Sequence, residues 1–187
     1  MDETNRGQDY YHGGKYNFLR WHGFNLTQAD ENNPKIQQFY TNATIIASFK
    51  DYIRTLVTHV NPYTNLSYAD DPTIFAYETG NELLGPVWGD KNVPAEWVAD
   101  IGQYIKTLAP KKLFVDGTYG VNRTHLNISE VDIFSNHYYG PSTDKLEYDL
   151  EYGEAQAPPA VRVEHTHSSA CQFLRSTRRI LRGSMTG

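Results

Sequence analysis

Helix-like and strand-like apolar segments alternate along most of this chain, and the alternation limits the folds that it can adopt. Residues 44–60 place apolar side chains three or four positions apart, which predicts a helix with one apolar face. A polar turn at 61–71 follows, and the β-rich run at 73–78 then changes abruptly to polar residues at Asn81 and Glu82. A run that is apolar and then suddenly polar is typical of a buried parallel strand at its carboxyl end.

The same alternation continues beyond this point. Pro94 opens a second helical pattern that reaches Leu108, strand-like runs cover 113–117 and 131–139, and a last helical pattern covers 143–156. Strands separated by helical segments indicate parallel βα units, so a (β/α)8 (TIM) barrel and an open doubly wound sheet both fit. No glycine-rich phosphate loop follows any of these strands, which weighs against a nucleotide-binding doubly wound fold.

Length and charge narrow the function classes. The chain has 187 residues, 39% of them hydrophobic, which is enough for one domain with a core. It is shorter than the about 250 residues that are typical of a (β/α)8 barrel. Its formal net charge is −5, whereas a nucleic-acid-binding surface is strongly basic. No stretch reaches the roughly 18 apolar residues of a membrane helix. We therefore expect no nucleic-acid partner and no membrane span.

Polar side chains follow the predicted strands at the points where the strands end. Asn81 and Glu82 follow the first strand, Asp116 ends the second, and His137 and Tyr139 end the third. Because functional groups in a barrel sit at the carboxyl ends of the strands, we expect these side chains at one rim. Cleavage of a glycosidic bond needs a carboxylic acid that protonates the leaving oxygen. A carboxyl beside a carboxamide, an imidazole and a phenol therefore suits sugar chemistry.

Three motifs carry a resemblance to a known family. Asp-Asp-Pro-Thr-Ile stands at 70–74, Asn-Glu at 81–82 and His-x-Tyr at 137–139. With Tyr-His-Gly-Gly-Lys-Tyr at 11–16, the chain from about residue 8 to 152 resembles glycoside hydrolase family 5, and its mannanases in particular. The Asn-Glu dipeptide alone is a weak signal, but the three motifs in this order and spacing are a strong one. The resemblance implies a retaining endo-β-1,4-mannanase that acts on β-mannan-type polysaccharide or oligosaccharide.

The resemblance also implies roles for single residues. Glu82 would be the catalytic acid/base, and Asn81 would bind the 2-hydroxyl of the sugar at the cleavage point. His137 and Tyr139 would line the site near the nucleophile, and Trp88 would stack on a pyranose ring. The two-carboxylate mechanism needs no metal and no organic cofactor, so we expect none.

Structural alternatives stay open for several of these residues. Glu82 can be a solvated carboxylate at a strand end, and Trp88 can serve in packing as readily as in a sugar subsite. His137 can be a rim histidine with its hydrogen bonds satisfied. We interpret Asp116 mainly as a structural residue.

The second carboxyl of a retaining enzyme is not recognisable in the sequence. The family resemblance predicts an apolar strand ending in Gly-Glu after the helix at 143–156, but Glu164 lacks that context and Glu154 lies within the predicted helix. We recognise neither a seventh nor an eighth strand. We therefore expect an incomplete (β/α)8 barrel domain at 1–154, from about the loop after strand three to helix six, with little or no hydrolase activity of its own.

Residues 155–187 differ in composition from the rest. They hold one acid, Glu164, against five arginines, and none of the chain's 14 tyrosines. We expect an aberrant or disordered basic tail, with a natural basic extension as the alternative. His165 and His167 have no third ligand at a useful spacing, so they are a weak metal motif.

Five Asn-x-Ser/Thr acceptor motifs favour a secreted, glycosylated protein; their asparagines are Asn25, Asn42, Asn65, Asn122 and Asn127. The single cysteine, Cys171, says nothing about the compartment. Two functional alternatives remain beside the endo-mannanase. One is another family 5 β-glycanase or an exo-acting β-mannosidase, and the other is a non-catalytic, carbohydrate-binding pseudoenzyme fragment.

Overall fold

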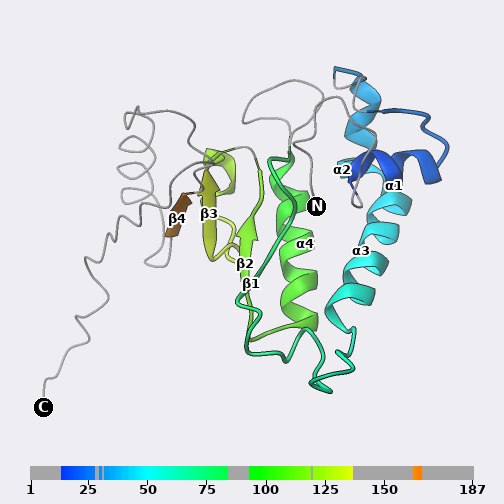
Figure 1. The fold of residues 1–187 in the computed structure, drawn as a ribbon. Helices are drawn as coiled ribbons and strands as arrows, with labels where there is room; N and C mark the ends of the chain where they lie inside the picture. Colours follow the sequence, from blue (N-terminus) through cyan, green and yellow to red (C-terminus); the bar gives the residue numbers. More distant parts are fainter. Residues whose placement is uncertain are drawn as a thin grey trace, which may run out of the picture.

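The computed structural model describes residues 14–27, 30, 32–83, 93–118 and 120–136, together with the backbone of one later strand. Four helices, two short 3-10 helices and four strands occur in this part of the chain (Figure 1). In chain order they are α1 (Lys15–Trp21), η2 (Pro34–Gln37), α2 (Gln38–Thr41), α3 (Ala43–Val57), β1 (Ala76–Glu78), α4 (Ala95–Leu108), β2 (Leu113–Asp116), η3 (Arg123–His125), β3 (Ile133–Asn136) and β4 (Arg162–His165).

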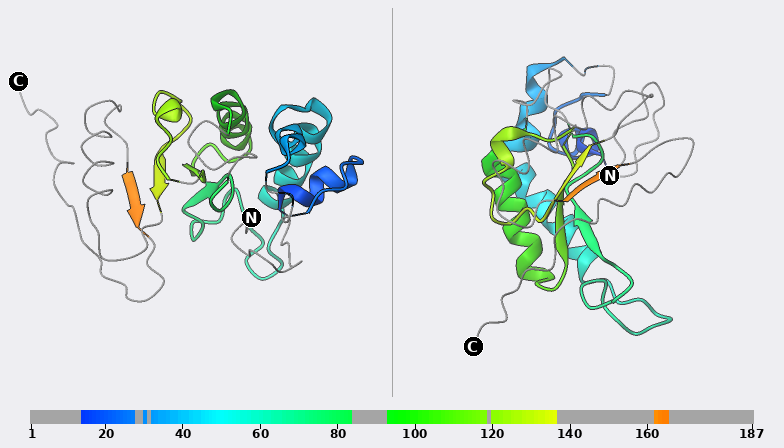
Figure 2. Two further views of the ribbon diagram at one scale, coloured as in Figure 1. Left: turned by 90° about the horizontal axis from the view of Figure 1, so that it is seen from above. Right: turned by 90° about the vertical axis from the view of Figure 1, so that its left-hand side faces the viewer.

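The four strands form one parallel sheet in the order β1-β2-β3-β4. Glu78 pairs with Val115, and Val115 pairs with Ile133, so the carboxyl ends of neighbouring strands come to the same edge. Figure 2 shows α4 against one face of the sheet with α3 beside it. The predicted parallel α/β arrangement is confirmed.

Helix α3 follows the predicted apolar period. The side chain of Asn42 caps its first turn, because Oδ1 accepts a hydrogen bond of 3.0 Å from the backbone N–H of Thr44. Its buried residues recur every four positions and are Ile45, Phe49, Ile53 and Val57. The helix ends at Val57 instead of residue 60, because Val60 pairs with Ser67 in an antiparallel bridge that closes the following hairpin.

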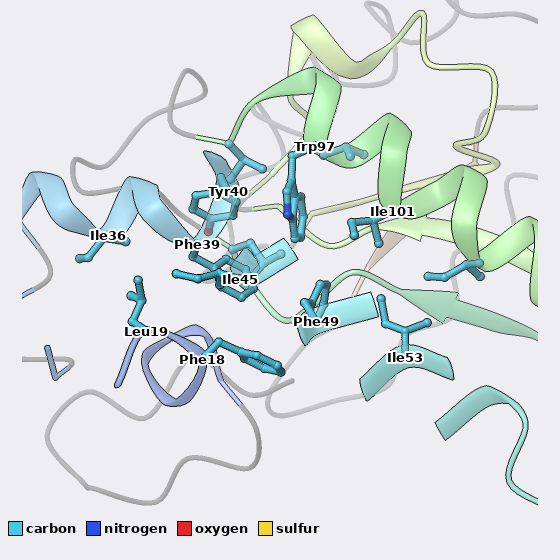
Figure 3. Packing of buried hydrophobic residues seen from close by; sticks show 14 of the residues in the cluster. Phe18, Leu19, Ile36, Phe39, Tyr40, Ile45, Phe49, Ile53, Trp97 and Ile101 are labelled. Atoms are coloured by element: carbon cyan, nitrogen blue, oxygen red, sulfur yellow. The ribbon is translucent and has the colours of Figure 1, made fainter. Parts of the chain in front are cut away.

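An aromatic cluster joins α1, α2, α3 and α4 (Figure 3). The ring of Phe49 stacks on Trp97 at a centroid separation of 5.7 Å and an interplanar angle of 16°. Phe18 and Phe39 meet Phe49 at 5.4 and 5.3 Å in edge-to-face geometry. Each such pair contributes about 0.5–1.5 kcal/mol beyond burial of its area, so this cluster fixes the helices against one another.

Strand β4 corrects one sequence-based expectation. We recognised no strand after residue 154, yet Arg162–His165 pair with β3 in parallel register, with Ser135 opposite Glu164. A four-residue strand with a single apolar side chain has no periodic signal, and its pairing comes from the neighbouring strand. The other residues of the expected tail, and the helix predicted at 143–156, lie outside the described residues. Among the described helices, none combines the length and apolarity that crossing a membrane requires.

Candidate active site

Glu82 lies just beyond the carboxyl end of β1 in an unusual backbone conformation. Its φ angle is +49°, in the left-handed region that residues with a Cβ rarely adopt, and its side chain is half-buried. Such a conformation costs of order 1–3 kcal/mol and persists only where the surroundings impose it. The next residue, Leu83, is fully buried, and its N–H donates to the carbonyl of Gly117 at 2.8 Å. This hydrogen bond and the burial of Leu83 therefore fix the turn on the C-terminal side of Glu82.

The ends of β1 and β2 approach each other closely beneath Glu82. The N–H of Gly117 donates to Oγ1 of Thr79 at 2.8 Å, and both residues are buried. A Cβ atom on Gly117 would lie 1.9 Å from the carbonyl oxygen of Gly80, a separation that no side chain tolerates. Only glycine at 117 allows this contact, so the sequence Asp116-Gly117 after β2 serves to position the turn that carries Glu82.

A buried acid–base pair fixes the loops around this turn. Oδ2 of Asp116 lies 2.7 Å from Nδ1 of His125, and both side chains are fully buried. The other ring nitrogen, Nε2, donates to the carbonyl of Val93 at 3.1 Å. Asp116 ends β2, His125 ends η3 and Val93 precedes α4, so one hydrogen-bonded chain joins two connections at this edge.

The partners of the two ring nitrogens define how His125 is held. A backbone carbonyl only accepts hydrogen bonds, so Nε2 of His125 carries a hydrogen. The contact between Nδ1 and Oδ2 of Asp116 is also at hydrogen-bond distance, so both ring nitrogens of the buried His125 are used in hydrogen bonds. The interpretation of Asp116 as structural agrees with this arrangement. Sequence reasoning missed His125, because no spacing rule connects it with Asp116.

The Asp-Asp-Pro-Thr motif lies at the opposite end of β1. Oδ1 of Asp71 accepts hydrogen bonds from the hydroxyl and the N–H of Thr73, at 2.7 and 2.9 Å. These bonds, the one from the hydroxyl first, hold the pKa of the Asp71 carboxyl below its usual value. The carbonyl of Asp71 accepts a hydrogen bond from the buried ammonium group of Lys112, at the start of β2. The motif thus aligns the amino ends of β1 and β2 and lies away from Glu82.

The structure brings together only some of the predicted site residues. Asn81 and Glu82 lie side by side after β1, both half-buried, near the end of β2. Asn136, which precedes His137 in sequence, ends β3 at the same edge. Trp88, His137 and Tyr139 themselves lie outside the described residues, so their roles stay predictions. In the part of the chain that the structure describes, no group of three His, Cys, Asp or Glu side chains could hold a metal ion.

Strand β4 adds a further acidic residue, Glu164, to the sheet. Glu164 is level with Ser135 of β3, one residue before the end of each strand. It is the only acid in residues 155–187. The backbone register therefore places this position near the carboxyl edge of the sheet, two strands away from β2.

Comparison with known proteins adds an independent line of evidence. The model of a family described as GH family 5 beta-mannosidase-like matches residues 8–150. Mannan endo-1,4-beta-mannosidase 8 of Oryza sativa subsp. japonica is 28% identical over 175 residues, which are 86% of this chain and 44% of that protein. Mannan endo-1,4-beta-mannosidase 1 of Arabidopsis thaliana is 33% identical over 120 residues, which are 63% of this chain and 26% of that protein.

Solved structures agree with these matches. The endo-1,4-beta-D-mannanase from Thermotoga petrophila RKU-1 superposes with a TM-score of 0.66 and 26% identity, covering 82% of this chain and 51% of that one. The endo-1,4-beta-mannanase from Rhizomucor miehei superposes with a TM-score of 0.62 and 26% identity, covering 81% and 49%. The chain thus spans about half, or less, of the length of these relatives.

Proposed function

Because the chain belongs to the β-mannosidase-like glycoside hydrolases of family 5, we propose that it carries the acid/base part of a retaining endo-β-1,4-mannanase. The observation that supports this most is the Asn81-Glu82 turn. A carboxyl-bearing residue is held in a costly left-handed conformation at the carboxyl edge of a parallel sheet. Strain of this kind clusters at functional sites.

Glu82 would act twice in the reaction. As an acid it would protonate the glycosidic oxygen while the bond to the leaving sugar breaks, and as a base it would later take a proton from the attacking water. Asn81 would hold the 2-hydroxyl of the sugar beside the reacting carbon, where a hydrogen bond strengthens in the transition state. In the same proposal His137 and Tyr139 line the site and Trp88 stacks on a pyranose ring.

A retaining mechanism needs a second carboxyl about 5–5.5 Å from the first. Glu164 is the candidate that the register of β4 supports, because its strand adds to the same parallel sheet. If no carboxyl reaches that position, the chain is a sugar-binding fragment without a nucleophile. The two outcomes differ in turnover but share the binding of manno-oligosaccharides.

We further propose that the four strands are consecutive strands of an incomplete (β/α)8 barrel. They are parallel and adjacent in chain order, and a helix lies in the connection between β1 and β2. Within the described sheet β1 is an edge strand, and Phe75, just before it, is 56% exposed. An open edge beside exposed apolar side chains favours poor solubility.

The experiment compares the chain with two variants of matched chemistry. Glu82→Gln keeps the shape of the side chain and removes the acid, whereas Glu96→Gln makes the same change on the exposed first turn of α4. Turnover is measured by the release of reducing ends from β-mannan, and binding by calorimetry with manno-oligosaccharides. We expect low turnover from this chain alone. Glu82→Gln should lower that turnover by a further factor of about 10²–10⁴, whereas Glu96→Gln should leave it unchanged.

The outcomes separate the alternatives. Binding without turnover supports the non-catalytic fragment. Preferred hydrolysis of β-glucan points to another β-glycanase, and release of single mannose units from chain ends points to an exo-β-mannosidase. A folded chain that neither binds nor cleaves any of these sugars would overturn the proposal. We also propose a secreted, extracellular location, on the strength of the five acceptor motifs.

A further inference from the structure

The structure separates the five Asn-x-Ser/Thr motifs into two groups. An N-linked oligosaccharide is attached through Nδ2 of the asparagine, so the folded protein must leave room in solvent for a bulky polar group. Three of the asparagines are exposed in the folded chain; they are Asn25, Asn65 and Asn127. The other two, Asn42 and Asn122, use their carboxamides to cap helices.

Asn122 cannot carry a glycan in this fold. The residue is 3% exposed, and Oδ1 accepts hydrogen bonds from the N–H and the hydroxyl of Thr124, at 3.0 and 2.8 Å. Three residues later, the buried His125 lies against Asp116. A sugar at Nδ2 would have to displace this packing or leave its hydroxyl groups buried without partners, which is costly for each group. Molecules that receive a glycan here before folding would therefore fail to reach the described structure.

Both polar atoms of the Asn42 carboxamide make hydrogen bonds. Oδ1 caps α3 through Thr44, and Nδ2 donates to Oε1 of Gln38 at 3.2 Å. Asn42 is only half-buried, so the fold hinders attachment of a glycan less here than at Asn122. A sugar at Nδ2 would nevertheless compete with the contact to Gln38 in the preceding helix.

Asn65 has the most defined surroundings of the exposed group. It lies in the hairpin between α3 and β1, where its N–H donates to the carbonyl of Asn61 at 2.8 Å, and its φ angle is +57°. Asn65 tolerates this left-handed conformation better than most residues do. Two positions earlier in the same turn, Tyr63 is 96% exposed, with its N–H bonded to Oδ1 of Asn61. An aromatic ring so exposed offers a flat apolar face to a sugar attached nearby.

From these contacts we propose that the folded chain carries N-linked oligosaccharides at Asn25, Asn65 and Asn127, and none at Asn42 and Asn122. The first sugar on Asn65 stacks on the ring of Tyr63. The inference rests on the proposed secreted location, since only proteins that enter the secretory pathway receive such glycans.

The Asn65 glycan is compatible with the proposed activity. The hairpin precedes the amino end of β1, at the lower end of the molecule in Figure 1, whereas Glu82 follows the carboxyl end of the same strand. A glycan on the hairpin therefore leaves the carboxyl edge of the sheet open to a polysaccharide.

The first test measures site occupancy directly. The chain is expressed with an added leader peptide in a eukaryotic host, so that entry into the secretory pathway does not depend on its natural location. Soluble and aggregated fractions are treated separately with an amidase in heavy-oxygen water, which converts each glycosylated Asn into labelled Asp. We expect label at Asn25, Asn65 and Asn127 in the soluble fraction, and label at Asn122 only among aggregates. Soluble protein labelled at Asn42 or at Asn122 overturns the proposal.

A second test does not depend on the host or on secretion. Each asparagine is replaced by cysteine in a Cys171→Ser background of protein made in bacteria, and its reaction with a bulky maleimide polymer is timed. We expect Asn25→Cys, Asn65→Cys and Asn127→Cys to react at similar rates in native and unfolded protein. Asn122→Cys reacts only on unfolding, or fails to fold, and Asn42→Cys reacts more slowly in the native state. Rapid native labelling of Asn122→Cys contradicts the assignment. If the three cysteine variants react rapidly in the native state but the secreted original chain carries no glycan, the glycan proposal is refuted. The sugar-cleavage proposal is not affected by that result.

A third test addresses the contact with Tyr63. Removal of the Asn65 glycan from the folded protein should lower its unfolding temperature, and the shift should shrink in Tyr63→Ala. Tyr52→Ala removes a partly exposed tyrosine ring of α3 that contacts Phe18 and lies outside the hairpin; it is the control, and it should leave the shift caused by glycan removal unchanged. An equal shift in Tyr63→Ala and in the original chain excludes the stacking.

Discussion

Nδ1 of His125 lies 2.7 Å from Oδ2 of Asp116, in a pair that no solvent reaches. The two residues are separated by nine positions and belong to different elements, yet together with Val93 they tie the connection after β2 to the start of α4. Val93, which lies just before α4 at the end of the connection from Glu82, is therefore held in place by a hydrogen bond. The pair also fixes Asp116, the residue before Gly117, whose own hydrogen bonds with Thr79 and Leu83 hold the candidate acid/base turn.

Removal of one partner of this pair should be strongly destabilising. His125→Ala removes a fully buried ring together with its hydrogen bonds to Asp116 and Val93, so we expect a cost of about 2–5 kcal/mol. Urea unfolding followed by tryptophan fluorescence measures the change. His59→Ala, at an exposed position after α3 where the ring contacts only Tyr68 edge to face, is the control and should cost about 1 kcal/mol or less. A similar small cost for His125→Ala would show that the pair is not formed in solution.

Gly117→Ala should disrupt the approach of β2 to β1. The added Cβ would lie 1.9 Å from the carbonyl oxygen of Gly80, and separating the two backbones would strain the hydrogen bonds that join Gly117 to Leu83 and Thr79. We expect a loss of more than about 3 kcal/mol or a failure to fold. Gly23→Ala is the matched control, since Gly23 has a φ of +85° but nothing within 4 Å of its Cβ position. That change should cost only about 1 kcal/mol of backbone strain.

The elements that sequence predicts best are those whose period is long enough to detect. Helices α3 and α4 and strand β2 all appear close to the predicted bounds, because each buries a regular set of apolar residues. Helices α1 and α2 have seven and four residues, too few for a period to show. Strand β4 depends on its pairing with β3.

The candidate site was only partly predictable. The change from apolar to polar residues after β1 located Asn81 and Glu82 at the strand end. The left-handed backbone of Glu82 and the role of His125 come from contacts with Gly117, Asp116 and Val93, which are distant in sequence. The Asp-Asp-Pro-Thr motif supported the family resemblance, but its hydrogen bonds show that Asp71 is structural.

The Asp71 turn should make part of the stability depend on pH. The hydrogen bonds from Thr73 lower the pKa of Asp71 in the folded chain, so their contribution is fully present above its unfolded pKa of about 4. It is lost as the pH falls through the lower folded value. Thr73→Ala should therefore be less stable than the original chain at pH 7, and the difference should shrink in acid. Unfolding at a series of pH values measures this, and a difference that stays constant down to pH 2 would contradict the assignment.

The backbone strain at Glu82 predicts an unusual order of stabilities. Glu82→Gly and Glu82→Ala remove the same carboxyl and the same contacts beyond Cβ, so their difference sets the strain of the left-handed conformation against the greater freedom of glycine in the unfolded chain. Glycine adopts this conformation freely, and we expect Glu82→Gly to be more stable than Glu82→Ala by about 1 kcal/mol. Ala99→Gly in the middle of α4 should show the opposite sign, with glycine less stable by about 1 kcal/mol. Urea midpoints of the variants give both differences. If glycine is no better than alanine at 82, the turn relaxes in solution, and the argument that the fold holds Glu82 in a strained, catalytic position loses its main support.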